Sequence, residues 1–148
     1  MRRALRGGFE LDDDPARVDV DAVHDFISQH AYWGRGRSRE VTAAAIAGSA
    51  RVLGLYRDGR QVGFARAISD RATLAYLADV YVLPAHRGHG LGLELISEMV
   101  DGEPGWNVRW LLHTADAQRL YGKLGFTSDL PEYAAMERPR GARARPSG

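Results

Sequence analysis

Residues 80–96 are the stretch that most constrains how this chain can fold. They begin with the apolar run Val80-Tyr81-Val82-Leu83, which predicts a buried strand. Pro84 ends that strand, because proline lacks the N–H that a strand ladder needs. After the turn Arg87-Gly88-His89-Gly90-Leu91-Gly92, apolar residues recur four apart from Leu91 onward, which predicts the inner face of a helix. The order is therefore strand, glycine-rich turn and helix.

A glycine-rich turn at a helix start predicts an anion-binding site. The first amides of a helix have no partner inside the helix, and the helix dipole adds roughly half a positive charge there. Glycines let the backbone approach a phosphate without a Cβ in the way, and Arg87 adds a cationic donor. The alternative is a surface turn without a ligand, although three glycines at a helix start lower stability unless a ligand uses them.

Two familiar phosphate-binding motifs do not fit this turn. A Walker loop ends in Gly-Lys-Ser/Thr, whereas Leu93 and Glu94 follow Gly92 here. The dinucleotide fingerprint Gly-x-Gly-x-x-Gly needs its third glycine one position later than Gly92. It also needs an acidic residue about 20 positions further on, where Arg109 and Trp110 stand.

The pattern that does fit is Arg-x-x-Gly-x-Gly, formed by Arg87, Gly90 and Gly92. With the preceding strand, it resembles the acyl-CoA signature of the GNAT N-acetyltransferase family. The resemblance implies that acetyl-CoA is the cosubstrate, with its diphosphate on the turn Arg87-Gly88-His89-Gly90-Leu91-Gly92. It also implies that backbone amides of Val80-Tyr81-Val82 hold the pantetheine arm and that one of them polarises the thioester carbonyl.

A second stretch, Leu120-Tyr121-Gly122-Lys123-Leu124-Gly125-Phe126, resembles the LY-x-K-x-GF ending of the same enzymes. In the family this tyrosine protonates the leaving CoA thiolate, so the resemblance gives that role to Tyr121. A phenol with a pKa of about 10 can donate to such a thiolate. Alternatively, Tyr121 is a core aromatic at helical spacing. Thr114 stands where many members carry an asparagine, and its hydroxyl is the expected CoA contact there.

The general base and the acceptor site are less strongly constrained. Asp79, beside the acyl-binding strand, is the predicted base and acceptor contact, unless it is a structural carboxylate. His113 is the other candidate base, unless it is a satisfied core histidine. Tyr32 and Trp33 either wall the acceptor pocket, which this loop shapes in relatives, or anchor packing. The chain has no cysteine, which excludes a cysteinyl acyl-enzyme.

Periodicity and turn residues predict one α/β domain with a mixed sheet. A hairpin at Asp58-Gly59 predicts antiparallel pairing, and the strand–helix–strand order over residues 72–113 predicts a parallel pair. The resemblance implies the GNAT fold, a mostly antiparallel sheet with a splayed parallel pair and about four helices, over residues 9–137. We expect residues 1–8 to be flexible and residues 138–148 to form a disordered basic tail.

Individual elements follow from the same signals. Asp19, Ser38 and Thr114 are the expected caps of three helices, the second with Val41 and Ile46 on its apolar face. Gly125 is expected to end the third in a left-handed conformation. The expected helices span about 19–30, 38–50, 90–101 and 114–125, and the expected strands are Phe9–Leu11, Val52–Tyr56, Gln61–Ile68, Ala72–Leu83, Val108–His113 and Tyr133–Met136.

Charge is unevenly distributed along the 148 residues. Residues 1–8 and 137–148 each carry a net charge of +3, so subtracting both from the total of +1 leaves −5 for residues 9–136. An acidic body does not suit nucleic acid and favours a cationic acceptor. No apolar run reaches the roughly 20 residues of a membrane span. Without cysteine or a signal peptide pattern, we expect a cytoplasmic protein.

The sequence thus predicts an N-acetyltransferase that moves the acetyl group of acetyl-CoA to an amine of a small molecule or peptide by direct attack. The expectation includes no metal and no nucleic-acid or membrane partner, and it leaves a homodimer open. The first alternative is a non-catalytic acyl-CoA-binding or regulatory module on the same fold. The second is an arginine-rich nucleic-acid binder.

Overall fold

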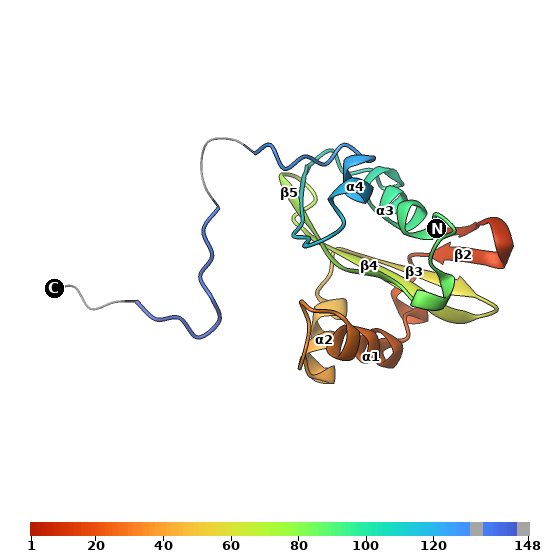
Figure 1. Ribbon diagram of the computed structural model, residues 1–148, viewed down its shortest axis with the longest axis horizontal. Coiled ribbons are helices and arrows are strands. Elements are labelled where there is room, and N and C mark those ends of the chain that lie inside the picture. The colour runs from red at the N-terminus through yellow and green to blue at the C-terminus, as the bar shows by residue number, and fades with distance from the viewer. Residues whose placement is uncertain (131–134, 145–148) are drawn as a thin grey trace.

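The computed structural model describes residues 1–130 and 135–144, and Figure 1 shows the arrangement of their elements. The helices are α1 (Val20–His30), α2 (Arg39–Ala47), α3 (Leu91–Asp101) and α4 (Gln118–Gly122). The strands are β1 (Arg2–Ala4), β2 (Phe9–Asp12), β3 (Arg51–Arg57), β4 (Arg60–Ser69), β5 (Leu74–Val82) and β6 (Arg109–Leu111). Short 3-10 turns span Arg6–Gly8, Pro15–Arg17 and Pro84–His86.

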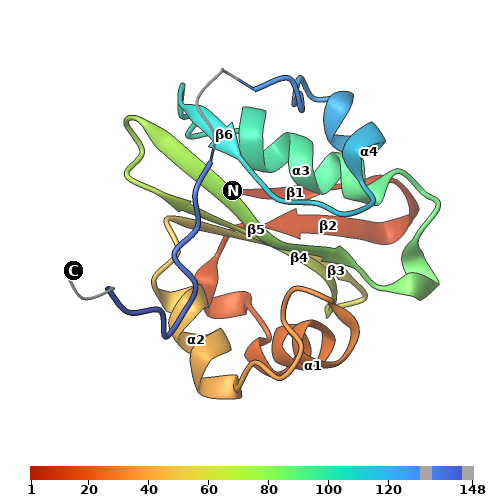
Figure 2. The ribbon, with the colours of Figure 1, turned by 60° about the vertical axis from the view of Figure 1, so that its left-hand side comes forward.

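The strands form one sheet in the order β1-β2-β3-β4-β5-β6. Each pair is antiparallel except β5 and β6, which are parallel and are joined through α3. Helices α1 and α2 cover one face, and α3 and α4 cover the other (Figures 1 and 2). The predicted mixed sheet, with its parallel pair around a crossover helix, is confirmed.

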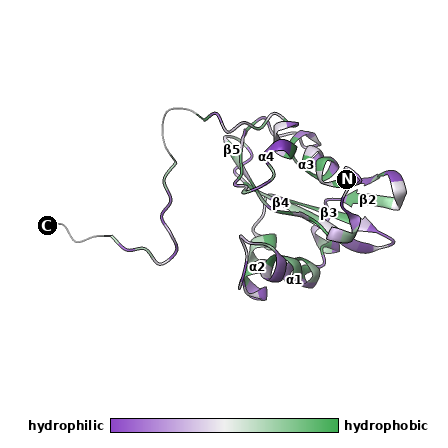
Figure 3. Ribbon diagram, in the orientation of Figure 1, coloured by the Kyte–Doolittle hydropathy of each residue, from purple (hydrophilic) through white to green (hydrophobic). Residues whose placement is uncertain are grey.

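Two apolar cores lie on the two faces of the sheet. One contains Leu91, Leu95 and Ile96 of α3 packed on strand residues, and the other contains Phe26 and Ile27 of α1. Hydrophobic colour accordingly runs along the middle strands, whereas the helices carry both colours (Figure 3). The sheet is therefore covered by an apolar core on each face.

The predicted caps explain where α1 and α2 begin. The side chain of Asp19 accepts a hydrogen bond from the Ala22 amide at 3.0 Å, and Ser38 accepts one from the Val41 amide at 3.2 Å. The face of α2 is a correction: Val41 is 43% exposed, and Thr42 is buried beside Ile46 instead. The helix is rotated so that Thr42 approaches α1, where its hydroxyl lies 3.5 Å from His24 Nδ1.

The chain at the N-terminus differs from the expectation. Residues 1–8 are predicted to be flexible, but β1 pairs with β2 over three residues and the 3-10 turn Arg6–Gly8 follows it. All three β1 residues are exposed, so no apolar pattern announces the strand. Backbone pairing and the ion pair between Arg2 and Glu10, at 2.6 Å, hold this edge in place.

The C-terminal elements are shorter than predicted. Strand β6 covers only the middle of the expected strand, and α4 begins at Gln118 rather than just after Thr114. Gly125 has the expected left-handed conformation, with φ of 86°, although the helix already ends at Gly122. Of the predicted strand Tyr133–Met136, residues 133 and 134 lie outside the described residues, and residues 135 and 136 form no helix or strand.

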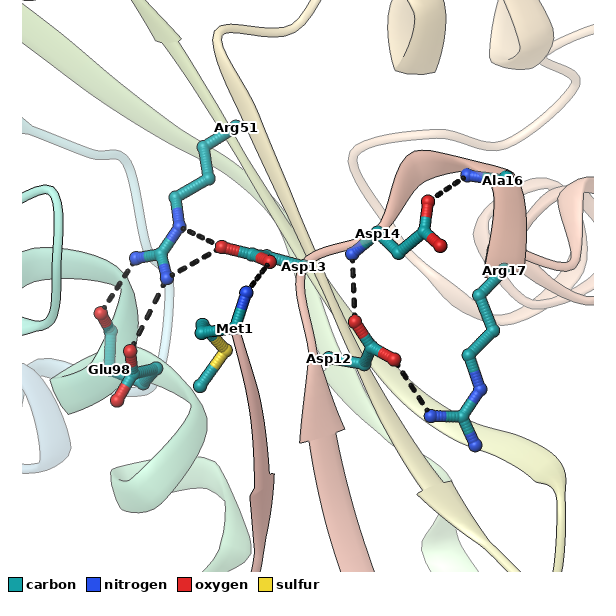
Figure 4. A network of polar contacts seen from close by, with 8 residues as sticks. All are labelled: Met1, Asp12, Asp13, Asp14, Ala16, Arg17, Arg51 and Glu98. Carbon is teal, nitrogen blue, oxygen red and sulfur yellow. Dashed lines mark hydrogen bonds and ion pairs between the residues drawn. The ribbon is translucent and has the colours of Figure 1, made fainter.

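A polar network joins the start of the chain to α3 (Figure 4). Arg51, only 8% exposed, donates to a carboxylate oxygen of Asp13 and to the backbone carbonyl and carboxylate of Glu98. Nearby, Arg17 donates to Asp12 at 3.0 Å. One guanidinium therefore binds two acidic residues, Asp13 after β2 and Glu98 on α3.

We expect Arg51→Gln to lower the free energy of unfolding by about 2 kcal/mol, because it leaves two acidic groups without their shared cation. Urea denaturation at pH 7 measures this loss. The control is Arg2→Gln, since Arg2 makes an ion pair with Glu10 but its side chain is 64% exposed. The control should cost at most about 0.5 kcal/mol, and equal losses in the two variants would contradict the role of Arg51.

Candidate active site

Strand β5, which lies next to the edge strand β6, contains a bulge in its second half. Phe64 pairs with Tyr81 and Arg66 with Ala78, so Asp79 and Val80 together face the single residue between them on β4. Asp79 has φ of 53°, a left-handed conformation that is uncommon for a non-glycine residue. A bulge of this kind leaves backbone groups unpaired and redirects side chains.

Beyond its first three residues, β5 has no partner strand on its outer edge among the described residues. Pairing with β6 stops at Tyr76, whereas β5 continues to Val82. The Leu83 amide donates to Val62 of β4 at 2.8 Å. By alternation, the amide of Tyr81 also faces β4, and those of Val80 and Val82 face the open edge. Of the three predicted amide contacts, this geometry leaves two available to a ligand.

The glycine-rich turn joins this edge to α3. Gly88 and Gly90 have φ of 86° and 72°, and a Cβ at either position would meet nothing within 4 Å. Gly90 is the N-cap of α3 and provides no side-chain hydrogen bond, so the first amides of the helix need an outside acceptor. Leu91 is buried in the core and His89 is exposed. The turn is an open cradle of backbone that can hold an anion.

Arg87 ties the turn to the end of β5. Its Nε donates to the carbonyl of Val82 at 2.9 Å, and the residue is exposed. This contact fixes the direction of the guanidinium, whose two terminal nitrogens have no hydrogen-bond partner among residues 1–130 and 135–144. They can therefore add to the positive potential of the cradle.

An open cavity of about 870 Å³ runs along β5, between the α1–α2 loop and the segment that leads from β6 into α4. Nearly all the site residues that the sequence predicts outside the glycine-rich turn line this cavity. These are Tyr32, Trp33, Asp79, Val80, Tyr81, Arg87, His113, Thr114 and Tyr121. Val82 and the residues from Gly88 to Gly92 do not line it.

Tyr121 reaches the cavity from α4 and is half-buried. Burial raises the pKa of Tyr121 to about 12, with smaller contributions from Tyr32 and Asp116. Its ring makes an edge contact with Phe126 at 5.6 Å between centroids. The phenol therefore stays protonated at neutral pH, which is the state that an acid requires.

Asp79 is buried under three donors. The Trp33 indole donates to one carboxylate oxygen at 2.9 Å, and Arg37 and Arg66 both donate to the other at 2.7 Å. Burial raises the pKa of Asp79, but the hydrogen bonds and charges of the two arginines outweigh it and leave the pKa below its ordinary value.

These contacts argue against Asp79 as the general base. A base needs an affinity for protons, whereas three hydrogen bonds, two of them from guanidiniums, stabilise the carboxylate form of Asp79. His113 is the candidate that remains: it lines the cavity and is exposed. Its Nδ1 lies 2.5 Å from the Tyr76 hydroxyl, which leaves Nε2 for another contact.

The loop of residues 31–37, here called the strap, forms one side of the cavity. Trp33 holds it to β5, and the Tyr32 hydroxyl accepts from the Ala115 amide at 2.9 Å on the opposite wall. The two rings meet edge-on, 5.0 Å apart. A Cβ at Gly34 would lie 2.2 Å from Ile27 Cγ2, so only glycine lets the strap pass this close to α1. Tyr32 and Trp33 are thus both cavity wall and anchors.

The Thr114 hydroxyl makes its hydrogen bonds within its own loop. Its hydroxyl accepts from the Ala117 amide at 3.0 Å and lies 3.4 Å from the Asp116 amide. The predicted cap is therefore formed, but it closes a turn that precedes α4, whose own N-cap residue is Ala117. Thr114 still borders the cavity.

Arg37 and Arg66 are site residues that the sequence reasoning missed. Arg66 carried the clearer signal, because it is a charged residue inside the apolar run of β4 and is 8% exposed. An ion in such a position needs a partner. Arg37, in a loop with several arginines, carried no signal of its own.

Other site types find little support in the described part of the chain. Among residues 1–130 and 135–144, no group of three or more His, Asp or Glu side chains is placed to hold a metal ion. None of the helices described there has the length and apolarity needed to cross a lipid bilayer.

Known proteins that resemble this chain are acetyltransferases by family or by name. A family model described as an acetyltransferase (GNAT) domain matches residues 48–128. A Gibberella zeae protein that carries the name "putative acetyltransferase" is 32% identical, over 89% of this chain and 86% of its own length. A crystal structure from Xanthomonas campestris pv. campestris, assigned to the GNAT family, is 38% identical with a TM-score of 0.81, covering 88% of this chain and 92% of its own.

A further solved structure, of a Staphylococcus aureus protein of unknown function, shares the fold at 20% identity. Its TM-score is 0.73, and the match covers 88% of this chain and 98% of that one.

We expect Asp79→Asn to lower the free energy of unfolding by about 3 kcal/mol at pH 7, because the buried guanidinium of Arg66 and the partly buried one of Arg37 lose their counter-ion. The pKa of Asp79 is lowered in the folded protein, so this contribution is present above its ordinary pKa and is lost as the pH falls below it. Denaturant titrations at pH 7 measure the loss.

The matched control is Asp21→Asn, since Asp21 pairs with Arg39 at a site where both side chains are more than half exposed. It should change stability by no more than about 0.5 kcal/mol. A loss of that small size for Asp79→Asn would show that the three-donor cluster contributes little to folding.

Proposed function

The chain belongs to the GNAT acetyltransferase family, and on that premise we propose that it transfers the acetyl group of acetyl-CoA to a primary amine of a small molecule or protein. One observation carries this proposal: Tyr121, the bulge of β5 and the strap all border a single cavity. The cavity follows β5 toward the glycine cradle, and Arg87 borders both. A thioester held along β5 would lie where a nucleophile and an acid can both reach it.

The glycine cradle is the proposed binding site for the CoA diphosphate. Open amides at the start of α3 offer hydrogen bonds to phosphate oxygens, and Arg87 adds a guanidinium. The pantetheine arm would then extend β5 as an added strand, using the amides of Val80 and Val82. The Val80 amide, which lies in the bulge, is suited to polarise the thioester carbonyl, since the bulge releases it from pairing with β4.

Direct transfer then needs two proton movements. The acceptor amine loses a proton as its nitrogen attacks the thioester carbon, and we assign the acceptance of that proton to His113, directly or through water. The carbon–sulfur bond breaks, and the departing thiolate takes the phenolic proton of Tyr121. A pKa of about 12 keeps Tyr121 protonated until this step. Asp79 positions the strap and Arg37 for the acceptor instead of taking a proton.

We propose the cytoplasm as the compartment of the reaction. A chain without cysteine has no disulfide that would require an oxidising compartment. The alternative of a non-catalytic acyl-CoA-binding module uses the same cradle, so binding alone does not separate it from an enzyme.

Tyr121→Phe tests the proposed function and separates it from that alternative. We expect turnover of acetyl-CoA to fall about 100-fold, as is typical when a general acid is lost, with the dissociation constant for acetyl-CoA unchanged. Release of free CoA thiol across a panel of amines measures turnover, and calorimetry measures binding. The matched control is Tyr56→Phe, which removes a buried hydroxyl that has no hydrogen-bond partner among the residues the structure describes.

The control should keep full turnover, because Tyr56 does not border the cavity. An unchanged rate in Tyr121→Phe would remove the tyrosine from the mechanism. Binding of acetyl-CoA without turnover by the wild-type protein on any amine would favour the non-catalytic module.

Gly90→Ala tests the cradle. We expect acetyl-CoA to bind roughly 10-fold more weakly, because a Cβ would point from a left-handed residue into the space for the diphosphate. Gly59→Ala is the matched control: Gly59 has φ of 77°, also with nothing within 4 Å, in the β3–β4 hairpin. Both variants should lose about 1 kcal/mol of stability. Equal affinities in both would place the diphosphate elsewhere.

A further inference from the structure

The acceptor end of the cavity carries an unbalanced positive charge. Two guanidiniums, on Arg37 and Arg66, share the single carboxylate of Asp79. The three side chains are 18%, 10% and 3% exposed, so water screens them poorly. Within the described residues, no other acidic side chain lies within 4 Å of either guanidinium. A half-buried net charge of about +1 costs free energy unless a further anion offsets it.

The two arginines also have donors to spare. Arg37 uses one terminal nitrogen for Asp79, and its Nε and second terminal nitrogen have no acceptor in the described part of the chain. Arg66 uses Nε for Asp79 and lies 3.5 Å from the Ser49 hydroxyl, which leaves one terminal nitrogen. Asp79 already accepts three hydrogen bonds, so these spare donors need a different acceptor.

Their position connects them to the amine that is acetylated. Both arginines border the cavity and meet at Asp79, inside the bulge where the thioester is expected. The CoA phosphates are assigned to Arg87 and the cradle, which follow the other end of β5. An anion held by Arg37 and Arg66 would therefore belong to the acceptor.

We propose that the acceptor is an amine that also carries an anionic group, a carboxylate or a phosphate, which binds to the spare donors of Arg37 and Arg66. This inference rests on the proposed function and specifies its substrate class. The aromatic rings of Tyr32, Trp33 and Tyr81 line the same space, so an apolar body between amine and anion fits it. The expectation of a cationic acceptor, drawn from the acidic body of the chain, is replaced by this local charge.

The test compares acceptors that differ only in the anionic group. L-Phenylalanine is measured against L-phenylalaninamide, and 2-aminoethyl phosphate against ethanolamine, with acetyl-CoA at saturation. We expect the anionic member of at least one pair to have a kcat/KM at least 10-fold higher, from two charge-assisted hydrogen bonds. The pair that shows the preference distinguishes carboxylate from phosphate. Preference for the neutral member, or none in either pair, would overturn the inference.

Variants then assign the preference to the arginines. Arg37→Gln should reduce it to less than 3-fold by raising KM for the anionic acceptor, whereas Arg37→Lys should retain part of it. The control is Arg35→Gln, which changes an exposed arginine of the same strap that does not border the cavity. An unchanged preference in Arg37→Gln, with melting temperatures matched, would contradict the assignment.

A binding measurement tests the inference independently of the proposed function. N-Acetyl-L-phenylalanine and its amide are titrated calorimetrically into the protein with CoA present. We expect tighter binding of the carboxylate, with the difference lost in Arg37→Gln. Equal binding of the two, together with no preference for 2-aminoethyl phosphate over ethanolamine, would overturn the inference even if other amines are acetylated. If neither acceptor pair is turned over, the panel of amines decides the proposed function, and this titration still decides whether the arginines bind a carboxylate.

Discussion

The strap side of the cavity depends on the burial of one carboxylate under three donors. Trp33 and Arg37 come from the strap, Arg66 comes from β4, and Asp79 sits in the bulge of β5. Because a buried carboxylate must keep its donors, the same contacts hold the strap against the sheet. They also stabilise a positive φ at Asp79 that an isolated strand would not adopt.

The two ends of the proposed reaction site differ in the groups that form them: backbone amides at one end and side chains at the other. The cradle consists of backbone amides and glycines that follow one another in the chain. The acceptor end consists of side chains that lie 13 to 46 residues from Asp79 in sequence. Backbone amides bind any phosphate in the same way, whereas side chains can differ between proteins. A shared cosubstrate with varied acceptors is the expected result of this division.

The same division explains what the sequence could predict. Local features were predictable, because a few consecutive residues determine each of them. These are the helix caps at Asp19 and Ser38, the hairpin at Asp58-Gly59 and the left-handed glycines of the cradle. Strand β1 was not predictable, since its stability comes from pairing with β2 and not from an apolar pattern. The Asp79 cluster was not either: the sequence offered Asp79 as a base because its two cationic partners become neighbours only in the folded sheet.

Asp79 and Tyr121 are held in fixed protonation states by opposite environments. Although burial opposes it, hydrogen bonding to Arg37 and Arg66 lowers the pKa of Asp79, and burial raises that of Tyr121 to about 12. Near neutral pH, therefore, neither group changes its charge, and neither can give the reaction a pH dependence there. Among the described residues that border the cavity, His30 and His113 offer imidazole nitrogens that can accept a proton from an amine. Because only His113 lies on the wall that leads to Tyr121, its position is the stronger argument for where the amine proton goes.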